Sequence, residues 1–390
     1  MNPTTQNWCL VVLAILAGVA GGRPSAKDGP RTIVPQLQAT QSQASLYRSE
    51  DRGTTWRAIG LGSLGVRALA IDPASPSTLY AGTESSGVFK STDWGNTWSA
   101  SNTGLKSLSI NALGINQSNP SMLHAATSGG LFKSSDGGAS WSAVGPKLPN
   151  PVFRSVIIDP VVSTTHYAAD AVWVAKSVDG GETWTYSTVG GDYVTSLAID
   201  PATPSTLYAG VFHATPRGGG VYRSLDGGVK WRFVSGGIIS PAGRYYDVNS
   251  LAIDPSRTSV VYAGTSAGGV FRSSDGGTTW MAANTGLGSV SVRALAIDPV
   301  SPSTIYAAVD DEGIFKSTDG AKTWTAATTG LGIRLPAALA VDPADPARVY
   351  AGLRGDGTAA PPTQVAADQV AAGQVAPGRV GAAPRPGAPR

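Results

Sequence analysis

The feature of this sequence that most constrains its fold is a nine-residue stretch that recurs seven times. Each copy, called a box below, begins with Lys or Arg and ends with Trp, as in KSTDWGNTW (Lys90–Trp98). The spacing of the box aspartates runs from 42 residues (Asp51 to Asp93) to 49 residues (Asp226 to Asp275). A period of this length indicates a repeat architecture. The box aspartates are Asp51, Asp93, Asp136, Asp179, Asp226, Asp275 and Asp319, and the box tryptophans are Trp56, Trp98, Trp141, Trp184, Trp231, Trp280 and Trp324.

Each period also contains four short runs of β-branched and aromatic residues. In the first complete period these are VRALAIDP, TLYAGT, GVFKS and NTWSA, bounded by Pro, Gly, Asp and Ser. Such runs are typical of β-strands, and no helical periodicity of useful length occurs between residues 46 and 353. Four strands in each period predict one blade of an all-β propeller.

The ends of the repeat region predict how the ring closes. The chain enters the pattern at Leu46–Ile59, which supplies only the third and fourth strands of a blade, and leaves it at Pro336–Leu353, which supplies only the first and second. Six complete blades and two complementary half-blades therefore predict a seven-bladed propeller with four antiparallel strands per blade over residues 46–353. Pairing of the half-blades would remove exposed sheet edges.

The segments outside the propeller are predicted to serve export. Residues 1–26 are interpreted as a signal peptide, cleaved near Ala20, with a short linker; residues 27–45 as an N-terminal linker; and residues 354–390 as a disordered tail rich in Ala, Pro, Gly and Gln. The apolar run Trp8–Ala20 has signal-peptide length and is too short to span a bilayer. It holds the only cysteine, Cys9. The expected location is secreted, periplasmic or cell-envelope, with no stable membrane span after cleavage.

Composition narrows the possible partners. The net charge is +3, and no basic run precedes the tail, so nucleic acid is not an expected partner. The three histidines, His124, His166 and His213, form no visible metal trio, and His124 occupies the position of the repeat tyrosine Tyr80. We expect a monomer without metal or cofactor.

Within a box, the aspartate is expected to accept hydrogen bonds from N–H groups of the turn. The glycine provides a positive φ angle, and the tryptophan covers the turn. In the last box Ala321 replaces this glycine, which predicts a strained turn or a different turn type. The basic residue that begins each box is interpreted as a turn or blade-to-blade contact.

On these boxes, the sequence resembles the BNR or Asp-box repeat family, whose signature is S/T-x-D-x-G-x-T/S-W. The match covers residues 46 to 353 and departs from the signature at Lys230 and Ala321. The family includes sialidases, xyloglucanase-type glycoside hydrolases, sortilin-like receptors, photosystem II assembly factors and exported bacterial propellers. The resemblance implies that the boxes are structural and lie away from the functional face, so it fixes the fold and leaves the function open.

In a propeller, the connections from second to third strands and from fourth to next first strands share one face, here called the loop face. The boxes and the Ile-Asp-Pro turns share the other, the box face. Two loops of the fourth complete blade are long, at Val211–Gly220 and Val234–Ser250. Their aromatic and basic side chains suit a sugar, an anionic ligand or a peptide; the alternative is that Tyr245 and Tyr246 only pack against the rim. The candidate binding residues are Tyr193, His213, Arg217, Arg244, Tyr245, Tyr246 and Asp247.

Weaker candidates for catalysis are loop carboxylates. Glu84, Asp310 and Asp311 are the possible acids, and two of them at a suitable separation could hydrolyse a glycoside. No sialidase-like arginine triad can be assigned from Arg67, Arg154, Arg244 and Arg293. The resemblance also implies that xyloglucanase-type enzymes use a cleft between two propellers, whereas this region predicts one.

The leading hypothesis is an exported, non-catalytic propeller that binds a polysaccharide or a protein through its loop face. The first alternative is a xyloglucanase-like glycoside hydrolase that uses loop carboxylates. The second is an assembly factor that resembles the photosystem II type.

Overall fold

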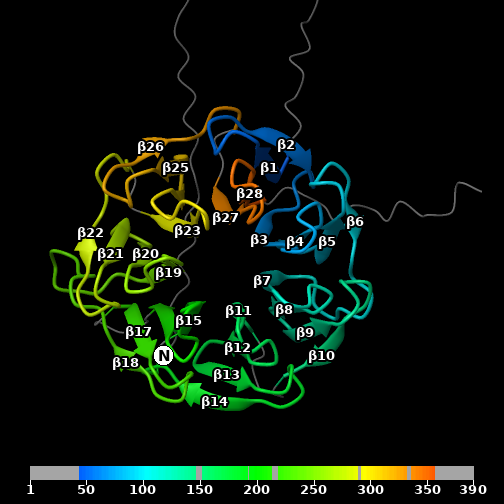
Figure 1. Ribbon diagram of the computed structural model, residues 1–390, viewed down its shortest axis with the longest axis horizontal. Coiled ribbons are helices and arrows are strands. Elements are labelled where there is room, and N and C mark those ends of the chain that lie inside the picture. Colours follow the sequence, from blue (N-terminus) through cyan, green and yellow to red (C-terminus); the bar gives the residue numbers. More distant parts are fainter. Residues whose placement is uncertain are drawn as a thin grey trace, which may run out of the picture. The chain divides into compact units, whose positions relative to one another are not determined.

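A computed structural model describes residues 44–145, 152–191, 193–212, 218–288, 291–331 and 335–355. These residues form seven four-stranded antiparallel sheets arranged as blades around a central axis (Figure 1). The prediction of an all-β, seven-bladed propeller is confirmed. The described part of the chain contains no helix, and thus none that could cross a membrane. The predicted signal peptide and most of the predicted tail lie outside the described residues.

The strands follow the predicted periods closely. Blade 1 comprises β3 (Val66–Ile71), β4 (Leu79–Thr83), β5 (Val88–Ser91) and β6 (Ser99–Ala100); blade 2 comprises β7 (Ile110–Ile115), β8 (Leu123–Thr127), β9 (Gly130–Ser134) and β10 (Ser142–Val144); and blade 3 comprises β11 (Ser155–Ile158), β12 (His166–Ala169), β13 (Trp173–Ser177) and β14 (Thr185–Thr188). Within each blade the first strand lines the centre of the ring and the fourth lies at the rim (Figure 1).

The second half of the ring repeats this order. Blade 4 comprises β15 (Tyr193–Ile199), β16 (Leu207–Phe212), β17 (Gly220–Ser224) and β18 (Arg232–Phe233); blade 5 comprises β19 (Val248–Ile253), β20 (Val261–Thr265), β21 (Val270–Ser273) and β22 (Met281–Ala282); and blade 6 comprises β23 (Val292–Ile297), β24 (Ile305–Val309), β25 (Gly313–Ser317) and β26 (Thr325–Ala326).

Blade 7 closes the ring from both ends of the repeat region. Its strands are β27 (Pro336–Val341), β28 (Val349–Leu353), β1 (Leu46–Ser49) and β2 (Arg57–Gly60). β28 pairs antiparallel with β1, with Tyr350 opposite Arg48, so the blue and orange strands share one sheet in Figure 1. The predicted pairing of the two half-blades is confirmed.

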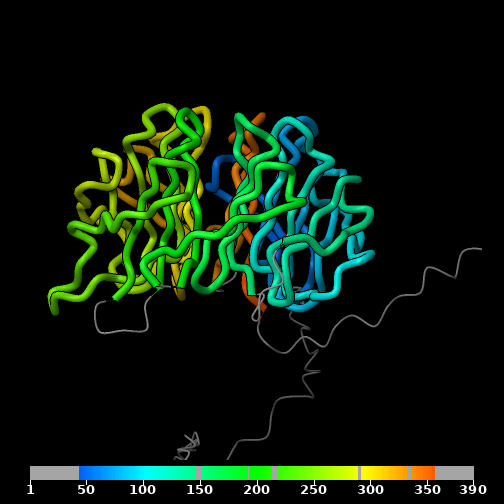
Figure 2. The backbone as a smooth tube through the Cα atoms, turned by 90° about the horizontal axis from the view of Figure 1, so that it is seen from below, coloured from blue at the N-terminus to red at the C-terminus, as the bar shows by residue number. Residues whose placement is uncertain are grey.

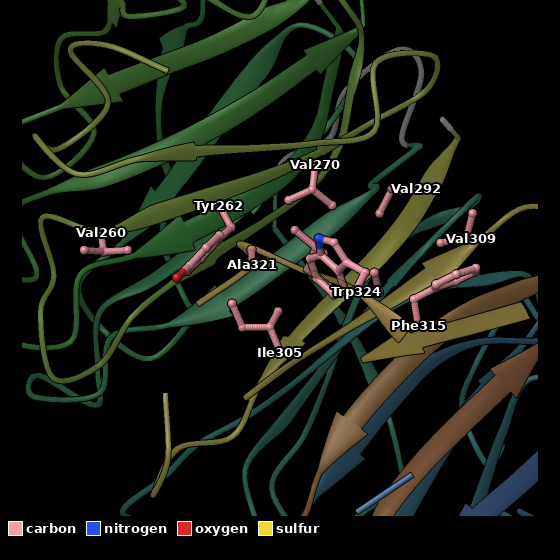
Figure 3. Close-up of a cluster of buried hydrophobic side chains, with 11 residues drawn as sticks. Val260, Tyr262, Val270, Val292, Ile305, Val309, Phe315, Ala321 and Trp324 are labelled. Carbon is pink, nitrogen blue, oxygen red and sulfur yellow. The ribbon is translucent and has the colours of Figure 1, made fainter. Parts of the chain in front are cut away.

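The core lies between neighbouring blades. In one cluster, Tyr262 from β20 packs with Ile305 from β24 and Trp324 from the box of blade 6 (Figure 3). Second strands supply most of this packing because all five residues of β4, β8, β20, β24 and β28 are buried. The hydrophobic effect therefore fixes each blade against the next.

The box turn is held by its own side chains. Asp93 accepts hydrogen bonds from the Thr97 backbone N–H at 2.9 Å and the Thr97 hydroxyl at 2.7 Å, and from Ser91 Oγ at 2.8 Å. These donors favour the charged carboxylate and lower the pKa of Asp93 to about 2. Trp98 donates from Nε1 to the Ile59 carbonyl of the preceding blade at 3.0 Å. The box aspartate is thus a turn residue, and the tryptophan also joins two blades.

The last box keeps this geometry without its glycine. Ala321 has φ of 66°, and its N–H donates to Ser317 Oγ at 2.9 Å, as the glycine N–H does in the other boxes. Of the two predicted outcomes, a strained turn or a different turn type, the structure has the strained turn, since a residue with a Cβ is disfavoured at positive φ. The Ala321 methyl lies between Tyr262 and Trp324 (Figure 3). There the Tyr262 hydroxyl is 3.5 Å from the Gly320 carbonyl, against 2.9 Å for the equivalent Tyr80 and Gly137.

His124 replaces the repeat tyrosine as a packed residue, as expected from its position. It is completely buried, and its Nε2 lies 2.9 Å from Nδ1 of His166, which is buried as well. His166 Nε2 faces the Ser163 carbonyl at 3.0 Å, so this nitrogen carries the proton and Nδ1 accepts from His124. Burial lowers the pKa of His124 to about 3, with the neighbouring His166 as the second cause.

Candidate functional site

The loop-face end of the central channel is lined by one residue from almost every blade. At this end, six first strands contain a β-bulge that displaces a single residue. Together with Arg354, these bulge residues line a hollow of about 210 Å³. The bulge residues are Arg67, Asn111, Thr195, Asn249, Arg293 and Ala337. We call this group, with Arg354, the channel mouth; the two ends of the channel open on the opposite faces seen edge-on in Figure 2.

Some of the mouth residues join neighbouring blades. Asn111 donates from Nδ2 to the Phe153 carbonyl at 2.7 Å, and Asn249 donates to the Val292 carbonyl at 2.9 Å. Thr195 likewise donates to the Val248 carbonyl. At three places around the ring, therefore, the bulge residue is used as a structural contact.

Two arginines at the same position form ion pairs within their own blades. Arg67 pairs with Glu84 of its own blade at 3.0 Å, and Arg293 pairs with Asp310 of its own blade at 2.7 Å. Arg354 lies 3.6 Å from the same Glu84. These side chains keep between 35% and 41% of their surface exposed, so their remaining N–H groups can reach a ligand.

Arg154 occupies the equivalent position in blade 3. Its backbone N–H bonds to the Ala169 carbonyl, the next residue begins β11, and its exposed side chain makes no ion pair among the described residues. Three arginines line the hollow against the two carboxylates of Glu84 and Asp310, which leaves one positive charge in excess (3 − 2), and Arg154 adds another at the equivalent position of blade 3. The loop-face end of the channel is therefore suited to an anion.

The candidate catalytic acids Glu84 and Asp310 both lie at this mouth. Their carboxylates form ion pairs with arginines, Glu84 with Arg67 and Asp310 with Arg293. Asp310 is buried; its Oδ2 also accepts from Ser291, and its Oδ1 has no hydrogen-bond partner within the described residues. Asp311 is exposed on a turn with φ of 63°. Glu84 and Asp310 are thus engaged in ion pairs, whereas Asp311 is exposed.

The candidate binding residues on the long loops of blade 4 are divided by the structure. Tyr245 packs edge-on against Phe233, with ring centres 4.8 Å apart, whereas Tyr246 packs toward Phe271 of blade 5 at 5.9 Å. The two tyrosines therefore contact different blades and are both half-buried. Arg244 is exposed.

Of the other candidates, one is described in blade 4 and one just before blade 5. Tyr193 is 42% exposed and pairs with Phe212, with ring centres 6.3 Å apart. Asp247 is half-buried and immediately precedes β19 of blade 5. His213 and Arg217 lie outside the described residues.

The opposite end of the channel has a different chemistry. A hollow of about 460 Å³ near the Ile-Asp-Pro turns is lined mainly by aliphatic side chains, among them Leu69, Leu113, Ile158 and Val341. The channel thus changes from aliphatic at the box face to basic at the loop face. Of the two described ends of the channel, only the loop-face end offers charged side chains to a ligand.

The basic channel mouth was missed by the sequence analysis, although its signal is present. When the seven first strands are aligned on their small or aliphatic residues, the second position reads Arg67, Asn111, Arg154, Thr195, Asn249, Arg293 and Ala337. Arginine was sought there as a sialidase triad. The bulge that turns this position toward the axis cannot be read from the repeat alone.

Comparisons with known proteins support the fold. No protein-family model matches the sequence, and no curated protein matches it. Among solved structures, a GH74 enzyme from Niastella koreensis is similar with a TM-score of 0.60 and 22% identity over 74% of this chain and 52% of that chain. An ancestral GH74 enzyme is similar with a TM-score of 0.61 and 19% identity over 80% and 45%. This chain therefore spans about half the length of these enzymes.

A second kind of neighbour is matched over nearly its whole length. YCF48 bound to D1 peptide has a TM-score of 0.57 and 15% identity over 75% of this chain and 92% of that chain. YCF48 from Cyanidioschyzon merolae has a TM-score of 0.58 and 15% identity over 77% and 99%. At these identities the likeness concerns the fold alone.

Proposed function

We propose that this chain is a non-catalytic binding module that holds an acidic segment of a partner protein at its channel mouth. The observation that carries the proposal is the set of three arginines that line a small hollow, Arg67, Arg293 and Arg354, with Arg154 at the equivalent position of blade 3, while Glu84 and Asp310 are the carboxylates that pair with them. Arginine N–H groups form charge-assisted hydrogen bonds to carboxylates, which are stronger than neutral ones. Export, inferred from the apolar run Trp8–Ala20, is part of the same proposal.

The size of the hollow favours a peptide over a polysaccharide. A volume of about 210 Å³ admits one or two carboxylate side chains, whereas a glycan chain needs a groove for several rings. That a neighbour of this fold is described as bound to a peptide agrees with this choice.

Binding should be measured with a short polyglutamate peptide against a matched polyglutamine peptide. We expect the acidic peptide to bind and the neutral one not to bind, with affinity that falls as salt is added because the charges are solvent-exposed. The test variant is Arg67→Gln/Arg154→Gln/Arg293→Gln, and we expect a loss of at least about tenfold. The matched control is Arg232→Gln, an exposed arginine on the outer strand of blade 4.

Three results would overturn this proposal. Equal binding by the triple variant and the wild type would remove the channel mouth from the interaction. Turnover of a plant or bacterial glycan that disappears in Glu84→Gln would establish the hydrolase alternative. Preference for polygalacturonate over polyglutamate would assign the same mouth to an acidic polysaccharide and refute the peptide.

A further inference from the structure

The basic residue that begins each box has a partner in six of the seven blades. Lys90 donates to the Gly137 carbonyl at 2.7 Å, and Arg223 donates to the Gly276 carbonyl at 2.5 Å, each in the box of the next blade. Lys316 and Arg48 make the same contact, Lys133 pairs with Glu182, and Lys176 lies over the Tyr167 ring.

Arg272, in blade 5, is the exception. Its side chain makes no hydrogen bond, ion pair or cation–π contact within the described residues, and its Nε is buried without a partner. The carbonyl that it would contact belongs to Gly320, in the box where alanine replaces glycine. The Tyr262 hydroxyl has also moved out to 3.5 Å from that carbonyl. At the interface that holds the Ala321 methyl, the arginine contact is therefore missing among the described residues and the tyrosine hydrogen bond is longer.

The space between these two blades is open. A hollow of about 320 Å³ at the box face is lined by Arg272 and Lys322, by the hydroxyl residues Ser274 and Thr285, and by Met281. Its lining includes no acid. The nearest box carboxylates are satisfied within their own turns, since Asp275 accepts from the Thr279 N–H and hydroxyl, and Asp319 accepts from the Thr323 N–H and hydroxyl.

The corresponding hollow of blade 4 shows what is unusual here. It measures about 250 Å³ and also carries basic residues, Arg223, Lys230 and Arg232. However, Asp226 lines it, and Arg223 is already engaged by the Gly276 carbonyl. The hollow between blades 5 and 6 therefore combines an unengaged guanidinium with an acid-free lining.

We infer that the hollow between blades 5 and 6 is a binding site for a phosphate or sulfate ester. A guanidinium can donate two parallel N–H bonds to such an oxyanion, with Lys322 as a second positive charge. The side chain of Met281 is 76% exposed at the rim, which provides an apolar contact for the carbon skeleton of the ester. The site lies on the face opposite the channel mouth and is independent of the function proposed above.

The first test uses phenyl phosphate, phenyl sulfate and the two inorganic anions, with dissociation constants measured by calorimetry. We expect both esters to bind more tightly than the inorganic ions, and the dianionic phosphate ester more tightly than the sulfate ester. Arg272→Gln should weaken binding about tenfold or more, and Lys322→Gln should weaken it less, because a lysine contributes a point charge without the paired geometry. Lys230→Gln, in the hollow of blade 4, is the matched control and should have no effect.

The second test removes no charge. Ala321→Gly should let Arg272 reach the Gly320 carbonyl, as Arg223 reaches Gly276, and so weaken ester binding several-fold. Circular dichroism would verify that each variant is folded. Ester binding that survives Arg272→Gln, or no ester binding to the wild type at millimolar concentration, would overturn the inference. Binding that is lost in Arg272→Gln and unchanged in Ala321→Gly would retain the site and refute the role of the alanine.

Discussion

The box turns and the inner-strand bulge positions each occur once per blade, yet they differ in what varies. Every box has the same serine-to-aspartate bond, 2.7 to 2.9 Å long, whether glycine, alanine, arginine or tryptophan occupies its variable places. The positions at the loop-face end of the channel share a backbone register but carry Arg, Asn, Thr or Ala. The bonds that recur in every box mark the residues that hold the ring together. The bulge positions, where the side chain varies on the same backbone, can instead contact a ligand.

The largest expected effect tests the structural side of this comparison. Trp141 is buried, and its Nε1 donates to the Ser101 carbonyl of the preceding blade at 2.8 Å. Trp141→Ala should lower the free energy of unfolding by about 3–5 kcal/mol, because it removes a large buried ring and leaves a cavity. Urea unfolding followed by fluorescence would measure it.

Trp94 is the matched control, because it is a box tryptophan whose side chain is exposed instead of buried between two blades. It is 43% exposed, has φ of 57°, and contacts Arg348 through its ring face at 5.6 Å. Trp94→Gly should change stability by less than about 1 kcal/mol, since relief of the positive φ offsets the lost contact. A larger loss for Trp94→Gly than for Trp141→Ala would contradict the division drawn here.

The next effect concerns pH and the histidine pair of blades 2 and 3. The folded-state pKa of His124 is about 3, below the ordinary 6.5, and burial also lowers the pKa of His166. The unfolded chain therefore binds more protons below pH 6.5, so this contribution to stability is complete above pH 6.5 and is lost as pH falls toward 3. We expect roughly 1.4 kcal/mol of lost stability for each pH unit from His124 in this window, with a further loss from His166.

The double variant His124→Tyr/His166→Leu introduces the residues found at these positions in other blades. It should remove most of the dependence of the free energy of unfolding on pH between pH 6.5 and 4.5. The box aspartates do not interfere, because a carboxylate whose pKa is lowered in the folded state, as that of Asp136 is, loses its contribution only as pH falls below its ordinary pKa of about 4. Chemical unfolding at several pH values would show it. An unchanged slope in the double variant would exclude the histidine pair as its source.

A smaller effect tests the glycine of the box. Gly277 has φ of 85°, and an added Cβ would lie 3.2 Å from the Tyr208 ring. Gly277→Ala should cost about 1–2 kcal/mol because it puts a Cβ at positive φ. Ala321→Gly, the reverse change in the last box, should alter stability by less than about 1 kcal/mol, because the relieved strain is offset by a lost buried methyl. Thermal unfolding of both variants would measure this, and a neutral Gly277→Ala would show that the strain is negligible.

The smallest expected effect on stability comes from the channel mouth. Arg154→Gln should change the free energy of unfolding by less than about 0.5 kcal/mol, because the side chain is exposed and has no ion pair within the described residues. The same variant should weaken binding of polyglutamate. A stability loss as large as that of a box variant would show that Arg154 is structural, and that the two sets of positions do not differ as described.

The candidate site could be predicted only in part. The sequence analysis placed function on the loop face and selected the long loops of blade 4, where Tyr245 and Tyr246 pack into different blades. A long loop contains additional residues, and these residues can pack against the protein as well as bind a ligand. Arg67 and Arg293 were visible in the sequence, but they are five blades apart along the chain. Around the closed ring, where blade 7 lies between blades 6 and 1, they are only two blades apart. Ring closure brings them together.

The sequence by itself determined the number of blades, the four strands in each, the closure by complementary half-blades and the structural role of the boxes. All of these depend on local turn chemistry and on a period repeated along the chain, which contacts between near neighbours are enough to specify. Only the tertiary structure decided which side chains meet at the channel mouth and which basic residue lacks a partner. Those outcomes depend on a ring of bulges from six strands and on one methyl group between two blades, and neither is encoded in any single repeat.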